Sequence, residues 1–141
     1  MAKRELYAHF CYNTRVTNEI LGVINGGWRT MVNPLTDTEQ RALARFKNTL
    51  QSLLGDDLLS LRLFGSRARE EGTEESDLDV LVVVPKKDRD LCRRIVEESL
   101  DIDLVYGTNL APTILSAYEY QRNRDYGTAF YVNVEREGVT L

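Results

Sequence analysis

An apolar run with two aspartates at its start constrains this chain more than any other stretch. Leu78 to Val84 is rich in β-branched residues and ends at Pro85, which is typical of a strand buried on both faces of a sheet. Asp77 and Asp79 point to the same face of such a strand, with Cα atoms about 6–7 Å apart. Paired carboxylates at a buried strand are costly unless their charge is compensated. They indicate either a solvated strand end or a cation site.

A third carboxylate favours the cation site. Asp101 to Tyr106 alternates acidic and apolar residues and is predicted to be a strand with Asp103 on its polar face. If the two strands are neighbours, three carboxylates meet, and Mg²⁺ prefers such oxygen ligands. Three carboxylates can hold the two metal ions of an in-line phosphoryl transfer. Asp101 could share this face, but a charged strand end is the more frequent explanation of that residue.

A glycine and a serine lie ten residues before these acids. Gly65-Ser66 follows Leu59 to Leu63, an alternating run that predicts a strand with one dry face. Glycine lets a backbone approach a ligand closely, and a helix that begins near Ser66 would direct N–H groups at an anion. Arg67 and Arg69 add positive charge. A Gly-Ser pair alone usually marks a simple turn, but its spacing from Asp-x-Asp makes an anion site more specific.

The other segments predict a small mixed sheet flanked by helices. Thr36-x-x-Glu39 is a capping box followed by apolar residues at helical spacing, so a helix is predicted over residues 37–54 and ends at Gly55. Residues 66–76 are predicted to hold a turn, a short helix and a loop. The remaining predicted elements are a helix at 88–99, a strand at 110–115, a helix at 116–124 opened by a second capping box, and a helix at 128–137. This order predicts an α+β (α/β) domain.

Residues 1–35 are predicted to be an N-terminal extension to a domain of residues 36–141. Residues 1–30 are locally basic and show only a short helical pattern. Arg4 and His9 have a spacing used by one family of ribonucleases, but the chain has no room for the helical bundle that such a site needs, so chance explains the spacing. Met31 directly precedes the first well-organised element, which suggests an accessory extension or a different start site.

Composition excludes several classes of protein. The 141 residues carry a formal net charge of −4, which argues against a protein that coats nucleic acid but not against a local basic groove. No apolar run reaches membrane-spanning length, and the start lacks a signal sequence. Cys11 and Cys92 match no metal-binding spacing and are predicted to be reduced thiols of a cytoplasmic protein.

These residues resemble a known family. Gly65-Ser66, ten residues, Asp77-x-Asp79 and the later Asp103 are similar to the motif of the DNA polymerase β-like nucleotidyltransferases, and most similar to the minimal nucleotidyltransferase (MNT) domain. The resemblance covers residues 36–141. One position departs from the motif: a glycine usually follows Arg69, whereas Glu70 stands here and Gly72 comes two residues later. We therefore expect the turn in this loop to be shifted.

The resemblance implies a polymerase β-like nucleotidyltransferase fold and a role for each matched residue. Gly65, Ser66 and Arg67 would hold the triphosphate of ATP. Asp77 and Asp79 would bind two Mg²⁺ ions, and Asp103 would bind one of them and help to deprotonate the acceptor hydroxyl. The hydroxyl would attack the α-phosphorus of ATP and release pyrophosphate.

The resemblance also implies a partner. MNT proteins are typically antitoxins that transfer AMP to a tyrosine hydroxyl of a HEPN-fold ribonuclease toxin, so a hetero-oligomer with such a toxin is expected. Two alternatives stay open: a binding module that neutralises the toxin by occlusion, and an enzyme whose acceptor is a small-molecule or RNA hydroxyl. Enzymes of the last kind usually carry a further acceptor-binding domain. Arg122, Arg124 and the tyrosines near them fit a partner surface or an ordinary amphipathic helix.

Overall fold

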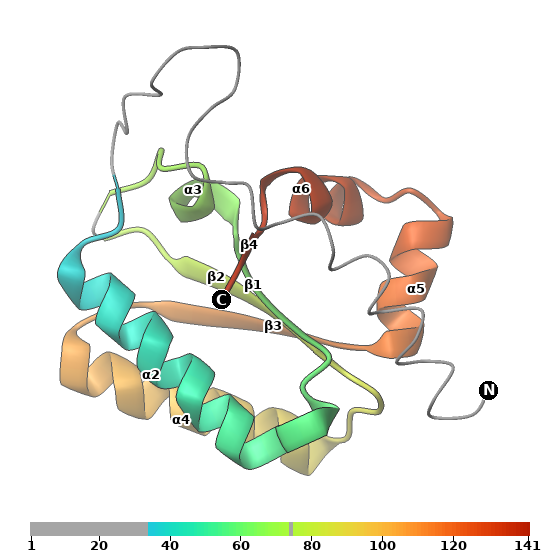
Figure 1. Cartoon of the computed structure of the whole chain (residues 1–141), viewed down its shortest axis with the longest axis horizontal. Coiled ribbons are helices and arrows are strands. Elements are labelled where there is room, and N and C mark those ends of the chain that lie inside the picture. The colour runs from blue at the N-terminus through green and yellow to red at the C-terminus, as the bar shows by residue number, and fades with distance from the viewer. Residues whose placement is uncertain (1–33, 74) are drawn as a thin grey trace. The chain divides into compact units, whose positions relative to one another are not determined.

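A four-stranded sheet with helices on both faces is built from residues 34–73 and 75–141, which are the residues that this computed structural model describes (Figure 1). The predicted Arg4–His9 pair lies outside them. In chain order the elements are α2 (Asp37–Leu54), the 3-10 turn η1 (Gly55–Asp57), β1 (Ser60–Phe64), α3 (Gly65–Ala68), β2 (Leu78–Val84), α4 (Arg89–Tyr106), β3 (Leu110–Ser116), α5 (Ala117–Asp125), α6 (Ala129–Glu137) and β4 (Val139–Thr140). No described helix is both long and apolar enough to span a membrane.

Both predicted capping boxes are confirmed, and they fix where α2 and α5 begin. The backbone N–H of Thr36 donates to Oε2 of Glu39 at 2.8 Å, and the N–H of Glu39 donates to Oγ1 of Thr36 at 3.2 Å. Ser116 and Glu119 make the same reciprocal pair at the start of α5. Each box satisfies two backbone donors that a helix start would otherwise leave without partners.

The sheet has the order β3-β2-β1-β4, so the predicted central strand β2 is an interior strand, as expected. β2 pairs antiparallel with β1, where Phe64 lies opposite Asp79, and parallel with β3, where Ala111 lies opposite Asp79. A parallel pair cannot be joined by a tight turn, and α4 supplies the crossover between β2 and β3.

The two faces of β2 have different neighbours. Leu78, Val80, Val82 and Val84 belong to the hydrophobic core that β2 shares with α2 and α4, together with Phe46, Leu50, Ile95 and Ile102. Because strand side chains alternate, Asp77 and Asp79 point to the other face, where α3, α5 and α6 lie (Figure 1). The alternation therefore separates the main core from the two acids.

The predicted strand at Asp101 to Tyr106 is wrong, because these residues form the last turns of α4. The helix begins at Asp88, whose side chain accepts the N–H of Leu91 at 2.9 Å, and ends at Gly107 in the left-handed conformation. Ile95, Ser99 and Ile102 are buried at helical spacing, so the apolar period of the first half continues through the acidic stretch. The strand that follows β2 in the sheet is β3, which was predicted as a fourth strand.

Within the described residues β3 pairs only with β2, so its other side is a sheet edge. The C=O of Asn109 accepts the N–H of Leu78 at 2.8 Å, which turns the backbone groups of every second residue from Leu110 onward toward the edge. Side chains occupy these groups: the Leu110 N–H donates to Asp103, the Ile114 C=O accepts from Lys87, and the Ser116 N–H donates to Glu119. Pro112 has no N–H to offer.

Candidate active site

The backbone of Gly65 lies directly against the carboxylate of Asp79. Gly65 has a φ of 76°, in the left-handed region that favours glycine, and a Cβ added there would be 2.3 Å from Oδ2 of Asp79. Only a residue without a side chain fits between α3 and β2 at this point. The structure thus brings together Gly65 and Asp79, two residues of the predicted motif.

Asp77 and Asp79 form an electrostatically strained pair. Burial raises the pKa of Asp79, the negative charge of Asp77 raises it further, and the positive charge of Arg69 acts in the opposite direction. A divalent cation would relieve this repulsion, and a donor set made only of carboxylate oxygens suits a hard cation such as Mg²⁺. Among the described residues no cluster of three or more acidic, histidine or cysteine side chains could hold a metal, so this part of the chain offers two carboxylates here.

Asp103 does not join this pair. It lies near the end of α4, which covers the opposite face of the sheet, and its carboxylate accepts the Thr108 hydroxyl at 2.7 Å and the Leu110 N–H at 2.9 Å. The sheet neighbours of Asp79 are Phe64 and Ala111, neither of which is acidic. The expectation that Asp103 completes the acidic site depended on the wrong strand.

Arg67 points into the protein rather than toward a ligand. Arg67 is 2% exposed and forms a bidentate ion pair with Glu39, itself 3% exposed, in which the Nε–Oε1 distance is 2.9 Å. The guanidinium also donates to the C=O groups of Gly72 and Pro34. This pair ties the start of α2 to α3 and the following loop. Arg67 was expected to contact a triphosphate. In the structure its guanidinium instead forms this buried ion pair.

Arg69 is the cation that acts on the acidic pair. Its guanidinium, partly exposed, donates from Nε to Glu71 at 2.8 Å and from Nη1 to Glu137, at the end of α6, at 2.9 Å. Its charge lowers the pKa of Asp79, as described above. The sequence predicts the charge of Arg69 near the anion site but gives this residue no specific role there. The contact with Glu137 had no local signal in the sequence.

The loop after Arg69 keeps its turn despite the missing glycine. Glu70 has a φ of 60°, so it adopts the left-handed conformation that glycine would adopt at this position, and the expected shift of the turn is not observed. Gly72 is enclosed, because a Cβ there would lie 2.8 Å from Cδ of Arg67 and 3.0 Å from Oγ of Ser66. The loop is therefore packed against both Ser66 and the buried ion pair.

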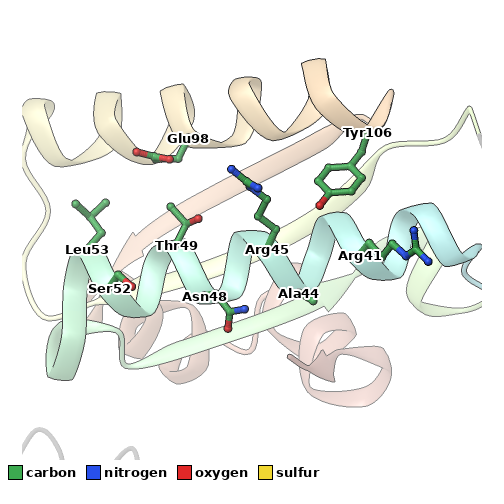
Figure 2. Close-up of a pocket in the computed structure, with 9 residues that line it drawn as sticks. All are labelled: Arg41, Ala44, Arg45, Asn48, Thr49, Ser52, Leu53, Glu98 and Tyr106. Atoms are coloured by element: carbon green, nitrogen blue, oxygen red, sulfur yellow. The ribbon is translucent and has the colours of Figure 1, made fainter.

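A separate groove of about 730 Å³ runs between α2 and α4 (Figure 2). Figure 2 shows Arg45, Glu98 and Tyr106 directed into the space between the two helices. Both helices cover the face of the sheet opposite the aspartates. The groove is therefore not part of the acidic site, and the candidate site is defined by Gly65, Asp77 and Asp79 rather than by this groove.

Comparison with known proteins gives the family. A family model described as a nucleotidyltransferase domain matches residues 43–125, which include Gly65, Ser66, Asp77 and Asp79. Three proteins of Methanocaldococcus jannaschii, each named "putative protein adenylyltransferase", are also similar. One is 33% identical over 106 residues, which are 73% of this chain and 97% of that protein. The chain belongs to the nucleotidyltransferase family.

Other matches are shorter or more distant. A second relative from the same organism is 36% identical over 76 residues, and the match spans about half of this chain and of that protein (52% of each). A solved structure described as a "putative minimal nucleotidyltransferase" aligns with a TM-score of 0.46 and 29% identity over 75% of this chain and 97% of that one. A toxin–antitoxin structure, MntA–HpeT, aligns with a TM-score of 0.41 and 20% identity over 67% and 70%.

Proposed function

We propose that this chain transfers AMP from ATP to a hydroxyl group of a partner protein. The observation that carries the proposal is the approach of the Gly65 backbone to Asp79, beside Asp77, in a chain of the nucleotidyltransferase family. Three relatives named as protein adenylyltransferases support AMP as the transferred group and a protein as the acceptor.

Each residue of the site has a part in the proposed transfer. Asp77 and Asp79 would hold the two Mg²⁺ ions, which supply charge neutralisation around the reacting phosphates. Gly65 allows a phosphate to approach the backbone, the Ser66 hydroxyl donates to it, and Arg69 takes the place first expected for Arg67. The residues position the triphosphate for in-line attack.

The transfer balances without a further co-reactant. The acceptor oxygen forms a bond to the α-phosphorus, the bond from the α-phosphorus to the bridging oxygen breaks, and pyrophosphate leaves with that electron pair. The hydroxyl proton goes to water in this proposal, because the sheet neighbours of Asp79, Phe64 and Ala111, are not bases. Asp103 takes no part in the proton transfer.

The motif's resemblance to MNT antitoxins supports a HEPN-fold ribonuclease toxin as the acceptor, with a tyrosine hydroxyl as the nucleophile and the cytoplasm as the location. To test the proposal, the chain is incubated with a HEPN-fold ribonuclease toxin, ATP and Mg²⁺, and the intact mass of that toxin is measured. We expect its mass to rise by whole AMP units. The D77N/D79N variant should abolish this rise, whereas Asp90→Asn, on the exposed surface of α4, should not.

The main alternative is an MNT-fold module that neutralises the toxin by occlusion. If the D77N/D79N variant transfers no AMP but still blocks the ribonuclease fully, occlusion is the mechanism and the enzymatic proposal fails. If the wild-type chain modifies only a small-molecule or RNA hydroxyl, the proposed class of acceptor is wrong although the chemistry stands.

A further inference from the structure

Two carboxylates bind the guanidinium of Arg69, and they differ in how much protein surrounds them. Glu137 accepts from Nη1 of Arg69 through Oε2 at 2.9 Å, and its Oε1 accepts from Nε of Arg136 at 3.1 Å, so both of its oxygens are engaged. The side chain of Glu137 is 16% exposed, whereas that of Glu71, the other partner of Arg69, is 65% exposed. Glu137 is therefore the more firmly held of the two.

The sheet fixes the end of α6 beside the turn that carries Arg69. Glu137 is the last residue of α6, and β4 follows almost at once and pairs with β1. β1 in turn leads directly into α3, at whose end Arg69 lies. Gly138 is enclosed, because a Cβ there would lie 2.3 Å from the C=O oxygen of Val134. The pairing of two neighbouring strands thus keeps Glu137 close to Arg69.

Glu71 lies on the loop after α3 and occupies a different nitrogen of Arg69. It accepts from Nε at 2.8 Å, and ion pairs between exposed groups contribute little to stability. An arginine has five N–H donors, and the described residues place no acceptor on Nη2 of Arg69. Nε and Nη2 form the edge of the guanidinium through which Arg67 binds Glu39. A phosphate in place of Glu71 would gain the same bidentate contact, while Glu137 kept Nη1.

We propose that Glu137 is a positioning residue, which keeps Arg69 directed at the acidic site while the triphosphate displaces Glu71. This inference rests on the function proposed above. The charge of Arg69 already acts at the site, since it lowers the pKa of Asp79. An arginine that is free in solution loses rotamer freedom when it binds a phosphate, whereas one that is already held loses less and binds more tightly. Glu137 thus raises the affinity for the nucleotide although its own charge repels a triphosphate.

The test is the binding of ATP with Mg²⁺ to the full chain, measured by isothermal titration calorimetry without an acceptor. Glu137→Ala and Glu71→Ala each remove one negative charge near the site, so charge alone would tighten binding in both. We expect instead that the Kd rises about tenfold in Glu137→Ala and is unchanged or lower in Glu71→Ala. Glu137→Gln keeps an acceptor oxygen and should give a Kd between those of Glu137→Ala and the wild type. Thermal unfolding shows which variants are folded, and Glu137→Gln replaces Glu137→Ala if the latter is not.

A double substitution shows whether Glu137 acts through Arg69. In an Arg69→Ala background, Glu137→Ala should raise the Kd no further, because no guanidinium remains to be held. A further rise of the same size overturns the inference. So does a Glu137→Ala variant that binds as tightly as the wild type, or a Glu71→Ala variant that binds as weakly as Glu137→Ala. In each of these outcomes the wild-type chain still binds the nucleotide, so the proposed function stands. A wild-type chain that binds no ATP with Mg²⁺ overturns both.

Discussion

Asp103 connects the end of α4 to the beginning of β3 through its carboxylate oxygens. The Leu110 N–H that it accepts is next to Asn109, whose C=O accepts the N–H of Leu78, the residue between the two acids of the site. Asp103 therefore helps to position β3 and, through β3, the start of β2. We therefore propose that it affects the site by positioning β3 rather than as a ligand.

The Asp103→Asn variant distinguishes a residue that positions β3 from one that binds the metal or substrate. Asp103→Asn keeps an acceptor oxygen for Leu110 and Thr108, so the rate of AMP transfer should stay within a few fold of the wild type. Asp103→Ala should lose about 1–3 kcal/mol of unfolding free energy, because a buried backbone donor loses its partner. Both are measured by intact-mass kinetics and by urea unfolding. A loss of activity in Asp103→Asn as large as in the D77N/D79N variant would show that Asp103 touches the metal or substrate.

Gly65 offers a second test with a matched control. Gly65→Ala and Gly127→Ala both place alanine at a positive φ, 76° and 56°, but only the first meets another side chain, Asp79. Each substitution should cost about 1–2 kcal/mol of stability from backbone strain. Only Gly65→Ala should in addition abolish AMP transfer, since Asp79 must move. Equal losses of activity in the two variants would contradict the assignment of the site.

Glu70 carries a backbone cost that a substitution can remove. Its φ of 60° is unfavourable for a residue with a Cβ, so Glu70→Gly should raise the unfolding free energy by about 1 kcal/mol. Glu75→Gly, an exposed change in the same loop without a positive φ, should instead leave it unchanged or lower it. Chemical denaturation of the two variants against the wild type decides the point.

Among the elements, α2 and α3 are joined by the buried pair of Glu39 and Arg67. Glu39→Gln leaves the Arg67 charge buried without its counter-ion, which should cost about 3–5 kcal/mol of unfolding free energy. Glu71→Gln removes a partner of Arg69 at the surface and should cost less than about 1 kcal/mol. Similar costs for the two variants would mean that burial does not govern the Glu39 pair.

The same pair makes stability depend on pH. Burial disfavours the charged form of Glu39, but its hydrogen bonds with Arg67 and the Thr36 backbone outweigh burial and lower its pKa below the usual 4.5. The contribution of Glu39 to the unfolding free energy is therefore complete above about pH 4.5, and it is lost as the pH falls through the lowered pKa of Glu39. Denaturation between pH 6 and pH 3 should show a shallower loss of stability in Glu39→Gln than in the wild type.

Most elements could be predicted because their signals are local. The capping boxes at Thr36 and Ser116 and the apolar run from Leu78 are each read within a few residues. Asp101 to Tyr106 was misassigned because alternation over a short stretch fits a strand, whereas the helical period that includes Ile102 is visible only over the whole of α4. Over a short stretch of sequence, the two-residue period of a strand is matched more easily than the 3.6-residue period of a helix.

The site could be predicted only where the motif fixes it. Gly65 and Asp79, both named by the motif, lie in contact because strand β2 and the turn after β1 determine their positions. The direction of Arg67 and the contact of Arg69 with Glu137 depend on how α2 and α6 pack, and no spacing in the sequence encodes that packing. The sequence therefore predicts which cationic residues lie near the motif, but not the direction in which their side chains point.

At the scale of the whole molecule, the domain of residues 36–141 remains a prediction that can be tested. The described part of the chain forms a hydrophobic core, from Ala42 to Leu110 with Leu141 packed against it. A chain that begins at Met31 keeps Pro34, which Arg67 contacts, and should unfold cooperatively with a midpoint close to that of the full chain. Failure to fold, seen by circular dichroism, would show that residues 1–30 are integral.

The side chains bonded to the edge of β3 bear on how this chain behaves when it is partly unfolded. A bare strand edge can template the addition of further strands, which is the first step of amyloid growth. Here Asp103, Lys87 and Glu119 occupy three of the backbone groups that such growth would need, and Pro112 lacks a fourth. Asp103 belongs to α4, so local melting of the end of α4 would remove one of these three bonds. We therefore expect melting of that helix end to make β3 more prone to pair with a further strand.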